Sequence, residues 1–121
     1  QVACGHSHTC VLMTDARVLC TGRNDEGQLG TGNITRHLTL QEVGDGTFRA
    51  DIIEAGGSHN CAISSGSVYC WGYNRYGQAG QGWATDVYSP HRVAWLGQSV
   101  QKVTCGWRHC CARLLDRWAC W

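Results

Sequence analysis

The chain has 121 residues, enough for one modest domain, and its 10 lysines and arginines nearly balance its 9 aspartates and glutamates. This balance argues against a basic surface for nucleic acid, and no apolar run approaches the roughly 18 residues that a membrane span needs. Nine cysteines are the outlier, because such a content is typical of disulfide-bonded extracellular proteins, and their odd number leaves at least one without an internal partner.

The chain repeats itself at a nearly constant period. Three segments align: CGHSHTCVL at 4–12, AGGSHNCAI at 55–63 and CGWRHCCAR at 105–113. Their shared cysteines, 51 and 50 residues apart, are Cys10, Cys61 and Cys111. The repeat units are approximately 1–51, 52–101 and 102–121, and the third is truncated. A fixed period of this length predicts a repeat architecture.

Short runs of β-forming residues recur in each unit, and no window has a sustained helical period. In chain order they are CVLM, VLC, CAI, SVYCW, KVTC and WACW. A two-residue hairpin turn at Ser65-Gly66 places Cys61 opposite Cys70 on a non-hydrogen-bonded pair. Such pairs bring Cα atoms to about 4.5 Å, within the range that a disulfide accepts.

The same count predicts two more hairpin disulfides. A turn around Leu115-Asp116 places Cys111 opposite Cys120. Cys10 and Cys20 flank a turn with one residue more than in the second unit, which a three-residue loop with a bulge accommodates. Each bridge closes a loop of about ten residues and is expected to contribute roughly 2 to 3 kcal/mol of stability.

Zinc is the alternative use of these cysteines, because histidines lie near them in the sequence: His6, His8, His59 and His109. No Cys-x-x-Cys occurs, so the spacing disfavours zinc, and we expect neither a metal nor another cofactor.

Several motifs together resemble the regulator of chromosome condensation repeat. They are G-x-x-H-x-C-A, V-Y-C-W-G-x-N-x-x-G-Q-x-G-x-G, S-P-x-x-V at 89–93 and V-x-x-V-x-C-G at 100–106. The resemblance covers the whole chain and is best in the second unit. The first unit departs from it, with Thr21 in place of the tryptophan and His37-Leu38 in place of Ser89-Pro90.

The resemblance implies an all-β fold of propeller blades, each a four-stranded antiparallel sheet, usually seven to a ring. The chain would supply about 2.4 blades, so we expect it to be part of a seven-bladed propeller or of a multi-chain assembly. Versions of the repeat with paired cysteines resemble those found in secreted proteins rather than the nuclear founding member of the family.

Residues that recur at one repeat position are expected to be structural. We expect the shared asparagines to cap a turn, the shared histidines to satisfy buried backbone groups, and the shared tryptophans to pack between blades. These residues are Asn24 and Asn74; His8, His59 and His109; and Trp71 and Trp121. The segment WGYNRYGQAGQG after Cys70 is expected to form an outer turn of the blade rather than a ligand loop.

Three cysteines lie outside the hairpin pairs, namely Cys4, Cys105 and Cys110. Cys105 could bridge locally to Cys110. Because the number of cysteines is odd, two alternatives remain open: one of the three has its partner outside the chain, or one thiol stays free. Because Cys4 and Cys105 share a repeat position, we expect both to face a neighbouring blade.

The sequence predicts a binding protein rather than an enzyme. It holds no G-x-S-x-G motif and no isolated cysteine beside a histidine and an aspartate, so we expect no catalytic residues. The favoured function is a non-catalytic extracellular module for protein-protein interaction or structural assembly. Its partner would be another protein, further copies of the chain or the remainder of the same chain.

Carbohydrate binding is the alternative function. Its ligand platforms would be aromatic residues outside the shared repeat positions: Trp83, Tyr88, Trp95 and Trp107. Nucleotide exchange or chromatin association, as in the nuclear member of the family, is disfavoured by the balanced charge and the paired cysteines.

One glycosylation sequon, Asn33-Ile34-Thr35, lies in a connector that we expect to be exposed. Together with the cysteine content, it predicts a glycan on Asn33 and an extracellular or secreted location.

Overall fold

The structure is a computed structural model that describes all 121 residues. It contains three antiparallel sheets. The first sheet contains β1 (Val2–Cys4), β2 (His8–Leu12), β3 (Val18–Gly22) and β4 (His37–Glu42). The second contains β5 (Ile52–Ala55), β6 (His59–Ser64), β7 (Ser67–Gly72) and β8 (Val87–Arg92). The third contains β9 (Lys102–Cys105), β10 (Cys110–Arg113) and β11 (Trp118–Cys120). The only helix is η1 (Ala94–Leu96), a 3-10 turn, and no helix is long and apolar enough to cross a membrane.

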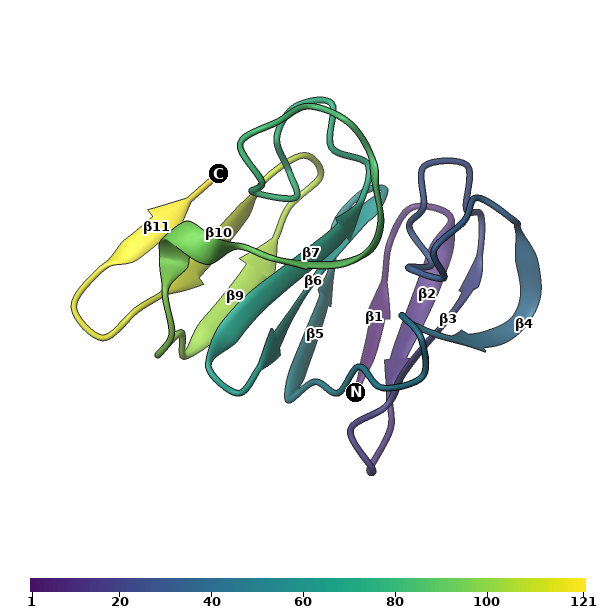
Figure 1. Ribbon diagram of the computed structural model, residues 1–121, viewed down its shortest axis with the longest axis horizontal. Helices are drawn as coiled ribbons and strands as arrows, with labels where there is room; N and C mark the ends of the chain where they lie inside the picture. Colours follow the sequence, from purple (N-terminus) through teal and green to yellow (C-terminus); the bar gives the residue numbers. More distant parts are fainter.

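The sheets lie side by side in sequence order, as Figure 1 shows. Within each sheet the strands are hydrogen-bonded in chain order, and the first strands of successive sheets contact one another, β1 with β5 and β5 with β9. Successive meander sheets packed through their first strands are the arrangement of propeller blades, so the expected all-β blade fold is confirmed.

The third unit forms three strands from only 20 residues. In the second unit, likewise, β5 to β7 are complete by Gly72, and only β8 follows the long loop. Most strands of a unit are therefore encoded in its first half. The value of 2.4 blades, obtained from chain length and period, counts the third sheet as less than half a blade although it contains three strands.

Local turn geometry sets the register of the second hairpin. Ser65 and Gly66 have positive φ angles of 48° and 77°, as a type I′ turn requires, and the residues that flank them pair with each other. Cys61 therefore faces Cys70 with a Cα separation of 4.1 Å, and the two form a disulfide. The other two predicted hairpin pairs are also joined: Cys10–Cys20 and Cys111–Cys120.

Cys105 and Cys110 face each other on β9 and β10 and form a fourth disulfide. The structure thus has the local bridge that the sequence allowed, and Cys4 is the cysteine left over. Cys4 is an exposed free thiol, and its neighbour across the strands is Thr9. Cys105 also lies beside the neighbouring blade, because its sulfur is within 4.8 Å of a ring nitrogen of His59 in the second sheet.

The tryptophans at the shared repeat position pack between sheets, as predicted. Trp71 is fully buried, and its indole N–H donates to the carbonyl of Gln28 at 3.1 Å. A Cβ atom on Gly30 would lie 2.7 Å from the indole nitrogen, so the ring rests directly on this glycine. Trp121 repeats the arrangement one sheet later, donating to the carbonyl of Gln78 at 2.8 Å.

The shared asparagines fasten the long loop after the third strand. The Asn74 amide donates to the carbonyls of Trp83 and Thr85 at 2.8 and 3.0 Å, and its oxygen accepts from the N–H of Ala79 at 2.8 Å. Asn24 makes the equivalent bonds in the first sheet. These side-chain to backbone bonds agree with the turn-capping role expected from the sequence.

Candidate functional site

The loops between the first two strands of successive sheets form a backbone ladder. The N–H of His6 donates to the carbonyl of Gly57 at 2.9 Å, and the N–H of Gly57 donates to the carbonyl of Trp107 at 3.1 Å. The rings of His6 and Trp107 meet edge to face with centroids 5.1 Å apart. This contact depends on Gly57, because a Cβ atom there would lie 2.7 Å from the Trp107 carbonyl oxygen.

Beside this ladder, the loop after β7 brings two tyrosines toward the third sheet. The rings of Tyr73 and Tyr76 lie 5.9 Å apart, and the guanidinium of Arg108 lies 4.7 Å from the centre of the Tyr76 ring. Trp107 and Tyr76 remain 58% and 62% exposed. We refer to His6, Tyr73, Tyr76, Trp107 and Arg108 as the Trp107 face.

The charge on the Trp107 face is unbalanced. Arg75, at its margin, lies 3.8 Å from Asp86, whereas Arg108 has no acidic partner within salt-bridge distance. A cation over an aromatic ring is attracted by the ring's negative face, which holds Arg108 in place while its N–H donors stay available.

Trp107 stands between two small hollows of about 220 and 240 Å³. One includes Tyr73 and Arg108, and the other includes the free thiol Cys4. Both are below the roughly 300 to 1,000 Å³ of typical small-molecule sites. The face is therefore better suited to side chains of a protein partner than to an enclosed ligand.

Tyr73 and Tyr76 belong to the segment that the sequence assigned to an outer turn. Their place on an exposed aromatic face was missed because it depends on the contact with Arg108, about 30 residues further along the chain. The one available signal was the loop residue Trp107, which stands where the other units have His6 and Gly57.

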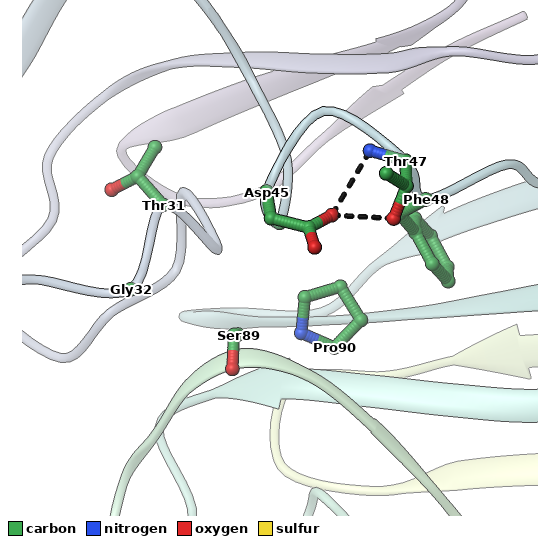
Figure 2. A pocket seen from close by; sticks show the side chains of 8 residues that line it. Thr31, Gly32, Asp45, Thr47, Phe48, Ser89 and Pro90 are labelled. Carbon is green, nitrogen blue, oxygen red and sulfur yellow. Dashed lines mark hydrogen bonds between the residues drawn. The ribbon is translucent and has the colours of Figure 1, made fainter.

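A polar hollow of about 540 Å³ lies between the first and second sheets (Figure 2). Its lining residues are Thr31, Gly32, Gly44, Asp45, Thr47, Phe48, Ser89 and Pro90. Asp45 accepts hydrogen bonds from the hydroxyl and the N–H of Thr47, and these bonds lower the pKa of its carboxyl below the ordinary value. Figure 2 shows the Pro90 ring opposite these two residues. A single carboxylate already bonded within its own loop provides no acid-base pair.

An aromatic hollow of about 630 Å³ lies at the second sheet, next to Trp121. Its hydrophobic lining residues are Tyr76, Trp83, Ala84, Trp95 and Trp121. Of the four aromatic residues considered for carbohydrate binding, the structure brings Trp83 and Trp95 together here. Trp107 belongs to the Trp107 face, and Tyr88 lies on β8 against the loop of the first sheet that contains Gly27.

The shared histidines contact side chains of the following sheet. His8 Nε2 lies 2.9 Å from Asn60 Oδ1, and His59 Nε2 lies 3.1 Å from Cys110 Sγ. Burial lowers the pKa of both imidazoles, that of His59 to about 4. The expected backbone partners are thus wrong for these two residues, because Asn60 and Cys110 occupy the position that faces each ring. His109, at the same repeat position, is exposed.

His59 also belongs to a cluster of possible metal ligands. Its ring nitrogen and the sulfurs of Cys105 and Cys110 all lie within 4.8 Å of one another. No sequence motif marks this cluster, because His59 precedes the two cysteines by 46 and 51 residues and belongs to another sheet. Metal binding by cysteine requires the thiolate, and both sulfurs are bonded to each other here.

The sequon lies in the exposed loop between β3 and β4. Asn33 Oδ1 accepts hydrogen bonds from the hydroxyl of Thr31 at 3.1 Å and from the N–H of Thr35 at 3.0 Å. The Asn33 side chain is exposed, so its amide nitrogen is accessible for attachment of a glycan.

Comparison with known sequences identifies the repeat. Family models of the Regulator of chromosome condensation (RCC1) repeat match residues 65–113, and residues 1–28 and 51–78. The chain is 39% identical over 113 residues to the Ultraviolet-B receptor UVR8 of Arabidopsis thaliana, covering 90% of this chain and 26% of that protein. It is 38% identical over 115 residues to Protein RCC2 homolog of Danio rerio, covering 88% and 23%. The chain thus spans about a quarter of the length of these relatives.

Solved structures give the same result. Human WBSCR16 matches with a TM-score of 0.81 and 28% identity, over 96% of this chain and 31% of that chain. Prp20p of Saccharomyces cerevisiae matches in fold with a TM-score of 0.79 and 20% identity, over 96% of this chain and 31% of that chain. The repeat period, the blade topology and these matches lead to one conclusion: the chain belongs to the RCC1 repeat family of β-propellers.

Proposed function

We propose that this chain is a non-catalytic propeller module that binds a protein partner through the Trp107 face. The observation that carries the proposal is the pair of exposed rings, Trp107 and Tyr76, beside the unpaired cation of Arg108. Tryptophan, tyrosine and arginine are enriched among the residues that dominate binding free energy at protein interfaces. Protein binding is also recorded for structural relatives, since yeast RCC1 (Prp20) was solved bound to Kap60 and Prp20p was studied for binding to Gsp1p and histones.

The face favours a partner with an acidic side chain next to an apolar surface. Arg108 would form a charge-assisted hydrogen bond with a carboxylate, which is stronger than a bond between neutral groups. Trp107 would supply the buried apolar contact, and the hollows on its two sides would receive neighbouring side chains of the partner.

Replacing Trp107 with alanine is expected to weaken partner binding at least tenfold, because a central aromatic anchor is lost. The measurement is affinity capture from source material, followed by titration calorimetry with the purified binding protein. Arg108→Glu should weaken binding more than Trp107→Ala does, because the new glutamate would repel a carboxylate of the partner.

Trp118→Ala is the matched control, since Trp118 is 55% exposed and lies in a hollow that contains no residue of the face. It should retain wild-type affinity. Loss of binding in Trp118→Ala, with unchanged binding in Trp107→Ala, would assign the partner to another surface.

Carbohydrate binding at the aromatic hollow is the second candidate function. It is favoured by the convergence of Trp83, Trp95 and Trp121 on one concave surface, where sugar rings could stack. A glycan array distinguishes the two functions: a carbohydrate bound by the wild type and by Trp107→Ala, but not by Trp95→Ala, would favour this candidate.

We further propose that the protein acts in an extracellular or secretory compartment. Four disulfides within 121 residues support this location, because disulfides persist in oxidising compartments and are rare where thiols are kept reduced. The exposed sequon at Asn33 is consistent with it.

Protein secreted from eukaryotic cells is expected to carry a glycan on Asn33. Intact-mass measurement should show a heavier species that an N-glycosidase converts to the mass of the polypeptide. Thr35→Ala, which removes the sequon and leaves Asn33 in place, should lack the additional mass. An unmodified peptide containing Asn33 from native material would contradict the prediction.

A further inference from the structure

We propose that His59, Cys105 and Cys110 form a zinc-binding site when the Cys105–Cys110 disulfide is reduced. The site lies between the second sheet, which supplies His59 from β6, and the third sheet, which supplies both cysteines. It does not involve the Trp107 face, and it requires reduction of one of the four disulfides that support the location proposed above.

The geometry of the three side chains is close to that of a zinc site. His59 Nε2 lies 3.1 Å from Cys110 Sγ, and all three ligand atoms lie within 4.8 Å of one another. Tetrahedral zinc, with bonds of about 2.3 Å to sulfur and 2.0 Å to nitrogen, places its ligands about 3.5 to 3.8 Å apart. After reduction, the two sulfurs need to separate across the strand pair, and the His59 nitrogen needs to come to a similar distance from both, starting within 4.8 Å of each.

His59 is positioned as a metal ligand. The side chain is fully buried, and Nε2 points toward Cys110, while Nδ1 has no hydrogen-bond partner. A fourth sulfur, Cys61 Sγ, lies 3.5 Å from Cys110 Sγ but is bonded to Cys70, so it is not a thiolate. Three protein ligands therefore converge, leaving one coordination position for solvent or another ligand.

The chain contains its own comparison for this site. Between the first and second sheets, His8 faces Asn60 at 2.9 Å, and Asn60 is paired across the strands with Ala55. Cys110 and Cys105 occupy the positions of these two residues in the next sheet. An amide oxygen is a better hydrogen-bond partner for an imidazole than a sulfur atom is. Packing against the histidine therefore does not require cysteines here. In the oxidised protein they form a disulfide, and after reduction they place two thiols beside the imidazole.

Reduction needs a dithiol, which supplies two electrons. One of its thiolates attacks the half-buried sulfur of Cys105, forming a mixed disulfide and releasing the Cys110 thiolate. The second thiol of the reagent then attacks the mixed disulfide, releasing Cys105 as a thiol and leaving the reagent as a disulfide. Zinc displaces the remaining thiol proton to solvent. The bound metal would join the two sheets, whereas the disulfide lies within the third sheet alone.

The test is metal titration of the full chain under anaerobic conditions, before and after treatment with a dithiol. Co²⁺ is the spectroscopic probe, because thiolate coordination gives a charge-transfer band, and Zn²⁺ affinity is measured by competition with a chromophoric chelator. We expect one equivalent of metal per reduced chain and no thiolate band in the oxidised protein. A reduced, folded chain without this band would overturn the proposal.

Two double variants locate the site. Cys105→Ala/Cys110→Asn installs the pair found at the first boundary, so it should fold and should bind zinc at least 100-fold more weakly. Cys111→Ala/Cys120→Ala removes the other partly exposed disulfide and should still bind one equivalent after reduction. His59→Gln keeps all the thiols and should lose at least tenfold in affinity. Full binding by the first variant, or no binding by the second while circular dichroism shows it folded, would refute the assignment.

Discussion

Trp71→Ala is expected to lower the free energy of unfolding by about 3 to 5 kcal/mol, as for other buried tryptophans. The ring is fully buried between the first and second sheets, where it rests on Gly30 and donates to the carbonyl of Gln28. The substitution leaves a cavity at this boundary and a buried carbonyl without its donor. Urea unfolding of both proteins at one pH measures the difference.

Trp83→Ala is the control for stability, because Trp83 is half-exposed and its loss is expected to change the free energy of unfolding by less than about 0.5 kcal/mol. Comparable losses in the two variants would contradict the conclusion that contacts between sheets, centred on Trp71, hold adjacent blades together.

Stability is expected to fall as the pH decreases from 7 toward 4, by about 3 kcal/mol from His59 alone. Burial lowers the pKa of His59 from 6.5 in the unfolded chain to about 4 in the folded protein. Between these values the unfolded chain binds a proton that the native state excludes, so acid favours unfolding. His8, whose pKa is also lowered by burial, acts in the same direction.

The window from pH 7 to 5 favours this effect, because Asp15 and Asp45 have pKa values below their ordinary range and take up protons only at lower pH. Burial raises the pKa of Glu54, so its protonation acts in the opposite direction and does not account for a loss of stability. About 2 kcal/mol of the loss should occur within this window. His59→Gln should flatten the profile, and His91→Gln, which removes an exposed histidine whose charge does not act on His59, should leave it unchanged. An identical slope in His59→Gln would show that other groups dominate.

The features that were predictable depend on neighbours in the chain. The turn at Ser65-Gly66 fixes the register of a hairpin closed within ten residues, so the pairing of Cys61 with Cys70 could be counted from the turn. Because the sequence is repeated, the same pairing could be inferred for the other two hairpins. Asn74 likewise caps a turn through bonds to residues at most 11 positions away.

The sequence alone therefore specified the blade repeat, the three hairpin bridges and the tryptophans between blades, since each follows from short-range geometry or from the period. The packing of one sheet on the next settled the rest: the contact of His59 with Cys110, the ladder through Gly57, and the stacking of Arg108 on Tyr76. Such contacts join residues about 30 to 50 positions apart, and their distances depend on how the sheets are rotated and spaced, for which the sequence carries no local signal.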